Sequence, residues 1–446
     1  MKFTKFGKAL MMSALSAAVI LSVTSCVESY TVGFLYVTGT VTSGTGGEGI
    51  ISGFKIDHNT GKLTSINGLP VSSGGSNPVR AVLVTGSKFL YVLNRGTNAQ
   101  GNGDCTTANP CQNSNITEFA VGGNGILTPQ ETFYTQGINP FRLIGDSSGT
   151  YLYVLDHDAP SSAACAAALG GTVTSCGDIT AFQINSSTGR LSLIQNAAVT
   201  VAGGADLTYF PVPANPVDFA NASGYVLTLS GTTPATSFPY TGGSTVFPYT
   251  YNSSSGQLTI SQNSSQSFGI SQANAIVPGG GYVYILDNEA NLVSGTGATS
   301  QILPFSVGSN GALTAQVSGV VADDPTLSNP IQLLVESKGK FLYVANQQGA
   351  STSSGAGIAV YTIAGGTSSS QLSEDSGSPY GTGAGPQCLV EDPSNQYIYT
   401  ANAADSTVTG KLIDPNSGAL RQMSGSSGTF PLTGPASWCV ADSRTN

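Results

Sequence analysis

The sequence predicts an all-β protein, a seven-bladed β-propeller with four antiparallel strands in each blade. An apolar strand pattern centred on an aromatic residue recurs along the chain, and a Gly-x-Leu or similar hairpin signal follows each copy. The spacing of the copies ranges from 55 residues, between Tyr36 and Tyr91, to 73 residues, between Tyr153 and Val226. The seven copies centre on Tyr36, Tyr91, Tyr153, Val226, Tyr284, Tyr343 and Tyr399. Such a repeat cannot bury both faces without neighbours, so the whole repeated region forms one domain.

One repeat shows the expected strand order within a blade. Residues 329–336 predict the innermost strand and residues 340–346 the second strand. Residues 357–363 predict the third strand, and a fourth begins near Leu372. Alternating β-branched and aromatic residues, bounded by Gly, Pro, Asn and Ser, support each assignment. Helical periodicity is essentially absent after the N-terminus.

The two ends of the chain are expected to close the ring together. The first strand, residues 34–37, has the pattern of a second strand, so the first blade lacks its innermost strand. Residues 434–442 resemble the innermost strands elsewhere, and pairing them into the first blade leaves no open sheet edge at the seam. The propeller is therefore expected to span residues 34–442, with a linker at 26–33 and a tail at 443–446.

The N-terminus predicts export and lipidation. Residues 1–25 carry three lysines and an apolar run too short to anchor a protein in a bilayer, as in a signal peptide. The segment ends Val-Thr-Ser-Cys, which resembles a bacterial lipobox with Cys26 as the acylated residue; the alternative is an ordinary signal peptide with a chance cysteine. The sequence thus predicts a lipid-anchored monomer of the cell envelope, on its periplasmic or extracellular side. Val27 favours the outer membrane where the cell has one.

Net charge argues against nucleic acid as a partner. The chain has 15 basic and 24 acidic residues, a formal charge of −9. Removal of residues 1–25 also removes Lys2, Lys5 and Lys8, which leaves a charge of −12. An acidic surface without a basic stripe repels a phosphate backbone.

Six cysteines remain beyond Cys26, an even number that predicts disulfides in an exported chain. Two pairs would each close a small loop within a long insertion, and the third would join the last blade to the first near the channel. The pairs are Cys105 with Cys111, Cys165 with Cys176, and Cys388 with Cys439. Zinc binding is the weaker interpretation because no pair has C-x-x-C spacing, and no metal is expected.

Loop lengths predict which end of the ring carries a site. Turns after the third strands are short, as at residues 57–61 and 414–418. These turns, which begin Asp-x-Asn-x-Gly, lack the glutamate of a calcium loop and are interpreted as hairpin turns. Long insertions after the second strands gather at the opposite end, where a rigid ring would present them around one mouth. These insertions are residues 38–50, 94–115, 156–178, 230–244, 287–300 and 346–356.

Several repeats resemble the lactonase family of seven-bladed propellers. The resemblance rests on Phe341-Leu-Tyr-Val-Ala-Asn346 and on Gln396-Tyr-Ile-Tyr-Thr-Ala-Asn402 followed by Asp414-Pro-Asn-Ser-Gly-Ala-Leu420. It covers about residues 34–442. The family includes propeller 6-phosphogluconolactonases and carboxy-muconate cyclizing enzymes, so the resemblance implies a hydrolase acting on a small lactone, without a cofactor, and His, Arg and acidic side chains around the mouth.

The candidate residues for that chemistry cluster in blades two to four. A lactonase needs a base to activate water and a cation to stabilise an oxyanion. We expect His157 or Asp156 as the base and Arg80 and Arg142 to hold the oxyanion or a substrate carboxylate. Further substrate-binding candidates are Arg95, Asn94 and Asp218. The alternative is that the arginines form salt bridges with Asp156, Asp158 and Asp218.

A second function remains open at this stage. None of the inner-strand residues expected at the mouth is the histidine that the family resemblance implies; they are Arg80, Arg142, Asp218, Gln332 and Gln387. The alternative is a noncatalytic cell-surface propeller that binds a polymer or a protein through its long-loop face. The aromatic residues between positions 238 and 251 are expected to belong to an insertion that covers a neighbouring loop; the alternative is that they stack on a sugar or an aromatic ligand.

Overall fold

The computed structural model describes residues 30–41, 47–84, 86, 88–200, 204–231, 244–261, 266–267, 272–279, 281–288, 300–316, 321–349, 355–364 and 372–442. The predicted export signal, Cys26 and the tail at 443–446 lie outside these residues.

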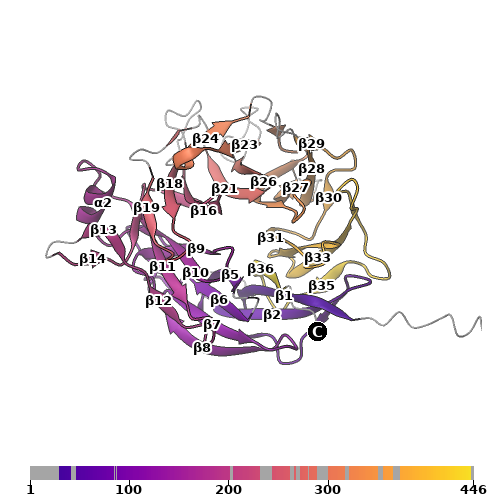
Figure 1. The fold of residues 1–446 in the computed structure, drawn as a ribbon. Coiled ribbons are helices and arrows are strands. Elements are labelled where there is room, and N and C mark those ends of the chain that lie inside the picture. Colours follow the sequence, from indigo (N-terminus) through magenta and orange to yellow (C-terminus); the bar gives the residue numbers. More distant parts are fainter. Residues whose placement is uncertain are drawn as a thin grey trace, which may run out of the picture.

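Seven antiparallel sheets surround a central axis, as the sequence predicts (Figure 1). In blades two to seven, four consecutive strands run outward from the axis. Blade two contains β5 (Pro78–Val84), β6 (Phe89–Asn94), β7 (Asn115–Val121) and β8 (Leu127–Phe133). Blade three contains β9 (Ile138–Gly145), β10 (Tyr151–Asp158), β11 (Gly177–Ile184) and β12 (Leu191–Leu193). Blade four contains β16 (Pro216–Ala222), β17 (Tyr225–Ser230), β18 (Thr245–Tyr251) and β19 (Leu258–Ile260).

The second half of the ring repeats this order. Blade five contains β21 (Ala273–Gly279), β22 (Tyr282–Asp287), β23 (Gln301–Val307) and β24 (Leu313–Ala315), with a 3-10 turn, η2 (Ser309–Gly311), before β24. Blade six contains β26 (Leu327–Val335), β27 (Phe341–Gly349), β28 (Gly357–Ile363) and β29 (Leu372–Glu374). Blade seven contains β31 (Pro386–Glu391), β32 (Tyr397–Asn402), β33 (Thr407–Ile413) and β34 (Leu420–Arg421).

Blade one is built from both ends of the chain. The C-terminal strand β36 (Ala436–Asp442) is its innermost strand and pairs antiparallel with β1 (Thr31–Thr40). β2 (Glu48–Asp57) and β3 (Leu63–Ser65) complete the sheet. The disulfide Cys388–Cys439 joins β31 of blade seven to β36. The predicted closure of the ring is confirmed.

Six blades carry a short fifth strand that the sequence pattern does not predict. Each such strand pairs with the third strand of its blade, on the segment that leads to the next blade. The fifth strands are β4 (Val71–Ser76), β15 (Phe210–Val212), β20 (Gln266–Ser267), β25 (Val321–Ala322), β30 (Tyr380–Gly381) and β35 (Thr429–Pro431). They cover polar third-strand edges that would otherwise stay open.

The insertion at 156–178 contains a short helix, contrary to the expectation that helices are absent after the N-terminus. α2 (Ser162–Leu169) starts at Ser161, whose hydroxyl accepts a hydrogen bond from the Ala164 backbone N–H, as in an N-cap. It packs on the hairpin of β13 (Asn196–Thr200) and β14 (Asp206–Leu207) through a small apolar cluster that includes Ala164 and Leu207. Both elements lie on the outside of the ring (Figure 1).

The aromatic residues of blade four need a correction. Thr245–Tyr251 is β18, the third strand of the blade, and Phe247 and Tyr249 are buried in the core, so this part does not belong to a covering insertion. Phe238 to Tyr240 lie outside the described residues. In the part of the chain that the structure describes, no helix is long and apolar enough to cross a membrane.

Candidate functional site

A cavity of about 490 Å³ opens where the innermost strands begin and the second strands end. That end carries the described insertions at 94–115 and 156–178, as predicted. The volume lies within the range typical of small-molecule sites. The cavity is lined by Val79, Arg80, Arg95, Phe141, Arg142, His157, Gln387, Ala403, Ala436 and Ser437. Four of the predicted site residues, three arginines and one histidine, therefore line one cavity.

A β-bulge near the start of each of three neighbouring inner strands sets the positions of Arg80, Arg142 and Asp218. In β5, pairing with β6 passes from Pro78 to Arg80 and skips one residue. The same skip precedes Arg142 in β9 and Asp218 in β16. A bulge redirects the side chains beside it. The repeated Asn-Pro-x-Arg/Asp pattern thus places three charged side chains at equivalent points around the channel.

Arg142 forms an ion pair with the next blade. Its Nε lies 3.2 Å from Oδ1 of Asp218. The other oxygen of Asp218 accepts a hydrogen bond of 2.9 Å from the backbone N–H of Ile276 in blade five. Asp218 is thus committed to linking blades three, four and five, and the expected salt bridge accounts for one arginine of the three.

Arg80 has a different environment. Its guanidinium carbon lies 3.8 Å from the ring centre of Trp438, which is in the inner strand of blade one. Its Nη1 donates to the backbone carbonyl of Val79. Burial and the nearby charge of Arg142 lower the pKa of Arg80, while Asp218 opposes that shift. Within the described residues, Arg80 has no carboxylate at ion-pair distance.

Arg95 follows β6 and points toward the same cavity. Its Nη2 donates to the backbone carbonyl of Cys105 at 3.3 Å, which ties it to the insertion closed by the Cys105–Cys111 disulfide. Burial and then the charge of Arg142 lower its pKa, and Asp104 and Asp158 raise it. Because the charge of Arg142 disfavours the charged forms of Arg80 and Arg95, an anion bound among the three guanidinium groups would be stabilised.

His157 is half-exposed at the end of β10, and its Nδ1 lies 3.1 Å from Oδ1 of Asp158. The two groups are not aligned for a hydrogen bond, so the carboxylate acts on Nδ1 through its negative charge, which favours the tautomer with the proton on Nδ1 and leaves Nε2 as an acceptor. Phe141 packs near the imidazole, with ring centres 6.3 Å apart. A neutral imidazole with a free Nε2 at a cavity wall has the properties of a general base.

Asp156, the other candidate base, does not line the cavity. Its side chain is fully buried and faces Asp178, its partner in the β10–β11 register. Thr180 donates to it at 3.2 Å. Burial raises the pKa of Asp156 to about 7, and burial together with the charge of Asp156 raises that of Asp178 further.

Asn94 also lies behind the cavity wall. The side chain is fully buried, accepts a hydrogen bond from Ser73 and donates to Asn115 and Thr117 within blade two. Asn94 therefore holds neighbouring strands together and does not belong to the lining of the cavity. The other histidine, His58, stacks on Tyr30 at a short turn between β2 and β3, away from the cavity.

Trp438, Ser437 and the role of Asp158 escaped the sequence reasoning, whereas Gln387 was expected at the mouth. Trp438, Ser437 and Gln387 belong to inner strands of blades one and seven, which meet blade two only after ring closure. Ser437 lies two residues after Pro435, as Arg80 lies two residues after Pro78, and this spacing was the available signal. Asp158 was considered only as a salt-bridge partner for arginine, whereas it lies beside His157.

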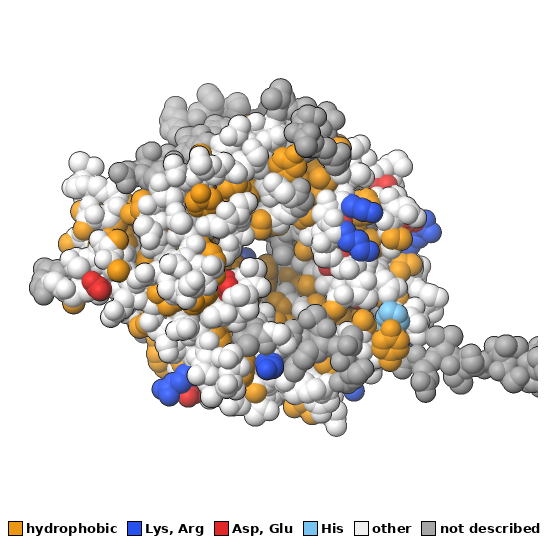
Figure 2. All heavy atoms as spheres, in the orientation of Figure 1, with side chains coloured by type: hydrophobic (Ala, Val, Ile, Leu, Met, Phe, Trp, Pro, Cys, Tyr) orange, Lys and Arg blue, Asp and Glu red, His pale blue; other side chains and the backbone are white. Residues whose placement is uncertain are grey.

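A larger cavity of about 680 Å³ lies between blades three, four and five, but no charged side chain among the described residues lines it, so the arginine-lined cavity is the better candidate for this chemistry. Figure 2 shows a hollow at the centre of the ring and few charged side chains on the visible face. In the described part of the chain, no group of three or more His, Cys, Asp or Glu side chains is arranged to hold a metal ion. The three predicted disulfides are all present, which indicates an oxidising compartment.

Comparison with known proteins supports the fold and one family. Residues 48–165 match the family model described as lactonase, 7-bladed beta-propeller. The fold is that of the lactonase propellers. No curated protein matches the sequence.

The chain is also similar to solved structures along nearly its whole length. A provisionally assigned 6-phosphogluconolactonase from Bacteroides fragilis has 15% identity and a TM-score of 0.62, over 92% of this chain and 98% of that one. The periplasmic gluconolactonase of Pseudomonas aeruginosa has 15% identity and a TM-score of 0.62, over 93% and 99%. A hypothetical selenium-binding protein from Sulfolobus tokodaii has 11% identity and a TM-score of 0.56, over 94% and 95%. At such identities these likenesses establish the fold alone.

Proposed function

We propose that this protein hydrolyses a small lactone that carries a carboxylate, in the cavity formed by blades one, two, three and seven. The observation that carries the proposal is the convergence of Arg80, Arg95, Arg142 and His157 on one cavity of about 490 Å³. A chain with a net charge of −9 concentrates positive charge there, and within the described residues only Arg142 of the three arginines has a carboxylate, that of Asp218, at ion-pair distance. Such a site favours an anionic ligand.

The residues that line the cavity can carry out each step of ester hydrolysis. Nε2 of His157 accepts a proton from a water molecule as the water oxygen attacks the lactone carbonyl carbon. The carbonyl oxygen becomes an oxyanion, which a guanidinium group stabilises. The ring C–O bond then breaks, and the leaving alkoxide takes the proton from the imidazolium. The product is a hydroxy acid, which ionises and releases one proton to the solvent.

The predicted location favours a carboxylate over a phosphate on the substrate. We propose export and a lipid anchor at Cys26, which would hold a monomer at the envelope, where cytoplasmic sugar phosphates are absent. A planar guanidinium can bind both oxygens of a carboxylate. The disulfides and the likeness to a periplasmic gluconolactonase support this setting.

A panel of charged and uncharged lactones, followed by proton release, tests the proposal. We expect turnover of at least one carboxylated lactone, and a loss of about 100-fold or more in kcat for His157→Gln. His58→Gln is the matched control because His58 lies outside the cavity. Absence of turnover above the spontaneous rate for every lactone would refute the proposal and favour the noncatalytic propeller that binds a polymer or protein through its long-loop face.

A further inference from the structure

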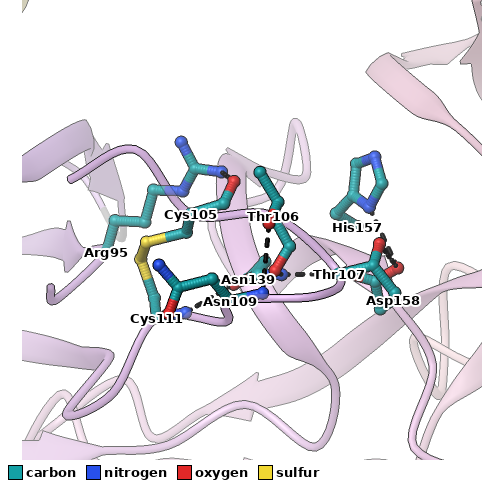
Figure 3. Close-up of polar contacts among 9 residues, drawn as sticks. All are labelled: Arg95, Cys105, Thr106, Thr107, Asn109, Cys111, Asn139, His157 and Asp158. Atoms are coloured by element: carbon teal, nitrogen blue, oxygen red, sulfur yellow. Dashed lines mark hydrogen bonds and ion pairs between the residues drawn. A yellow bond between two sulfur atoms is a disulfide. The ribbon is translucent and has the colours of Figure 1, made fainter. Parts of the chain in front are cut away.

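A buried side chain of blade three, Asn139, forms hydrogen bonds with the insertion of blade two (Figure 3). Asn139 is 1% exposed and lies at the start of β9. Its Oδ1 accepts a hydrogen bond of 2.7 Å from the backbone N–H of Cys111. Its Nδ2 donates to the backbone carbonyl of Thr106 at 3.3 Å and to Oδ2 of Asp158 at 2.9 Å. Both ends of the amide are thus used.

Asp158 transmits these contacts to His157. Its Oδ2 accepts from Asn139, and its Oδ1 accepts from the hydroxyl of Thr107 at 2.8 Å. The same Oδ1 lies 3.1 Å from Nδ1 of His157. The carboxylate is therefore held from both sides, and its position fixes which imidazole nitrogen faces it.

The same insertion also holds an arginine of the cavity. Arg95 donates to the carbonyl of Cys105, and the Ser114 hydroxyl donates to the carbonyl of Arg95 at 2.6 Å. The Cys105–Cys111 disulfide lies between the contacts to Arg95 and the contacts to Asn139 (Figure 3). One small covalent ring thus connects two walls of the cavity.

Backbone conformation by itself explains an asparagine here but not these contacts. Asn139 has a φ of 60°, and Asn215, which precedes Pro216 at the same place in blade four, has a φ of 56°. Asparagine tolerates this left-handed conformation better than most residues. Asn215, however, is exposed, whereas the buried amide of Asn139 joins the insertion of one blade to the acid beside His157 in the next.

We propose that Asn139 is a positioning residue that orients the Asp158–His157 pair and places it opposite Arg95. The Cys105–Cys111 loop holds the side chain of Asn139 in place through hydrogen bonds. The inference rests on the proposed function for its catalytic meaning, but the orientation of His157 can be measured without any substrate.

Imidazole nitrogen NMR on the mature protein tests the inference directly. The chain has two histidines, so His58→Gln assigns the signals of His157. We expect the neutral imidazole of His157 to carry its proton on Nδ1. Asn139→Gly, which keeps the left-handed backbone accessible, and the double variant Cys105→Ser/Cys111→Ser should both shift His157 toward a mixture of tautomers. Asn215→Gly is the matched control and should leave the signals unchanged.

The kinetic readout separates this inference from the proposed function. If lactone turnover is present, Asn139→Gly should lower kcat about tenfold with a smaller effect on KM, because it disturbs the orientation of the base. Unchanged His157 signals in a folded Asn139→Gly variant would overturn the inference even where turnover exists. The expected tautomer change in a protein without lactone turnover would uphold the positioning role and reject the proposed function.

Discussion

Within the described residues, tyrosine hydroxyls of the second strands join five of the blades to the next one, and Tyr284 of blade five makes no such bond. Tyr36 donates to the carbonyl of Gly125 at 2.8 Å, and Tyr153 donates to that of Gly256 at 2.8 Å. Tyr343 and Tyr399 make the equivalent bonds to Gly418 and Gly61. The sequence predicts the tyrosines and the glycine turns separately. It does not predict the bond, because the partners are 89 residues apart for Tyr36 and 103 apart for Tyr153.

Removal of one such hydroxyl should destabilise the ring measurably. Tyr153→Phe leaves the carbonyl of Gly256 without its buried donor, and we expect the free energy of unfolding to fall by about 1–2 kcal/mol. Tyr225→Phe is the control, since the Tyr225 hydroxyl accepts a bond from the Asn310 N–H in an exposed setting, and its effect should be smaller. Urea unfolding measures both. Equal midpoints for Tyr153→Phe and wild type would contradict the inter-blade role.

At the scale of a strand pair, blades two and three carry different residue pairs where the end of the second strand pairs with the start of the third. Asn94 pairs with Asn115 in blade two, whereas Asp156 pairs with Asp178 in blade three. Two amides can donate and accept, but two buried carboxylates must share a proton. The sequence placed Asp156 next to His157 and offered both as bases. Only the strand register shows that one is directed into the blade while the other lines the cavity.

This carboxyl pair should make stability depend on pH. Burial raises the pKa of Asp156 to about 7 from an ordinary value near 4 and raises that of Asp178 as well, so the folded state holds more protons than the unfolded state between those values. The contribution of this pair to the free energy of unfolding is therefore largest below about pH 4. It falls as the pH rises toward 7, by about 1.4 kcal/mol per pH unit for each proton that the folded state holds and the unfolded state does not.

Asp178→Asn isolates that contribution. The asparagine can donate to Asp156, as Asn94 donates to Asn115 in blade two, and the proton is no longer needed. We expect the difference in unfolding free energy between the variant and wild type to grow in favour of the variant from pH 4.5 to pH 7.5, as measured by urea unfolding. A constant difference across that range would show that the pair does not share a proton.

At the scale of the whole molecule, the repeat pattern and the leftover C-terminal strand sufficed to predict seven blades and their closure. The cavity lay beyond that reasoning because it joins blade two to blades one and seven, which are distant in sequence. Trp438 reaches Arg80, and Gln387 comes to line the same cavity, only when β36 has paired with β1 and closed the ring. The extra helix and the fifth strands depend on local packing that no periodicity encodes.

The disulfide at the seam should stabilise the ring more than a disulfide within a loop does. Cys388 and Cys439 are 51 residues apart, and Cys105 and Cys111 are 6 apart. Loop-closure entropy predicts losses of about 4 and about 2 kcal/mol when the first and second bonds are removed. The variants Cys388→Ala/Cys439→Ala and Cys105→Ser/Cys111→Ser, compared by denaturant unfolding, check this order. A larger loss from the loop disulfide would contradict it.

The central claim is that the arginine-lined cavity is a hydrolytic site selective for an anionic lactone. The most direct test is the ratio of kcat/KM for a carboxylated lactone to kcat/KM for its methyl ester, measured on the wild-type protein. We predict a ratio of about 10 or more, since charge-assisted bonds to guanidinium are lost in the ester. A ratio near one, or no turnover of either compound, would contradict the claim.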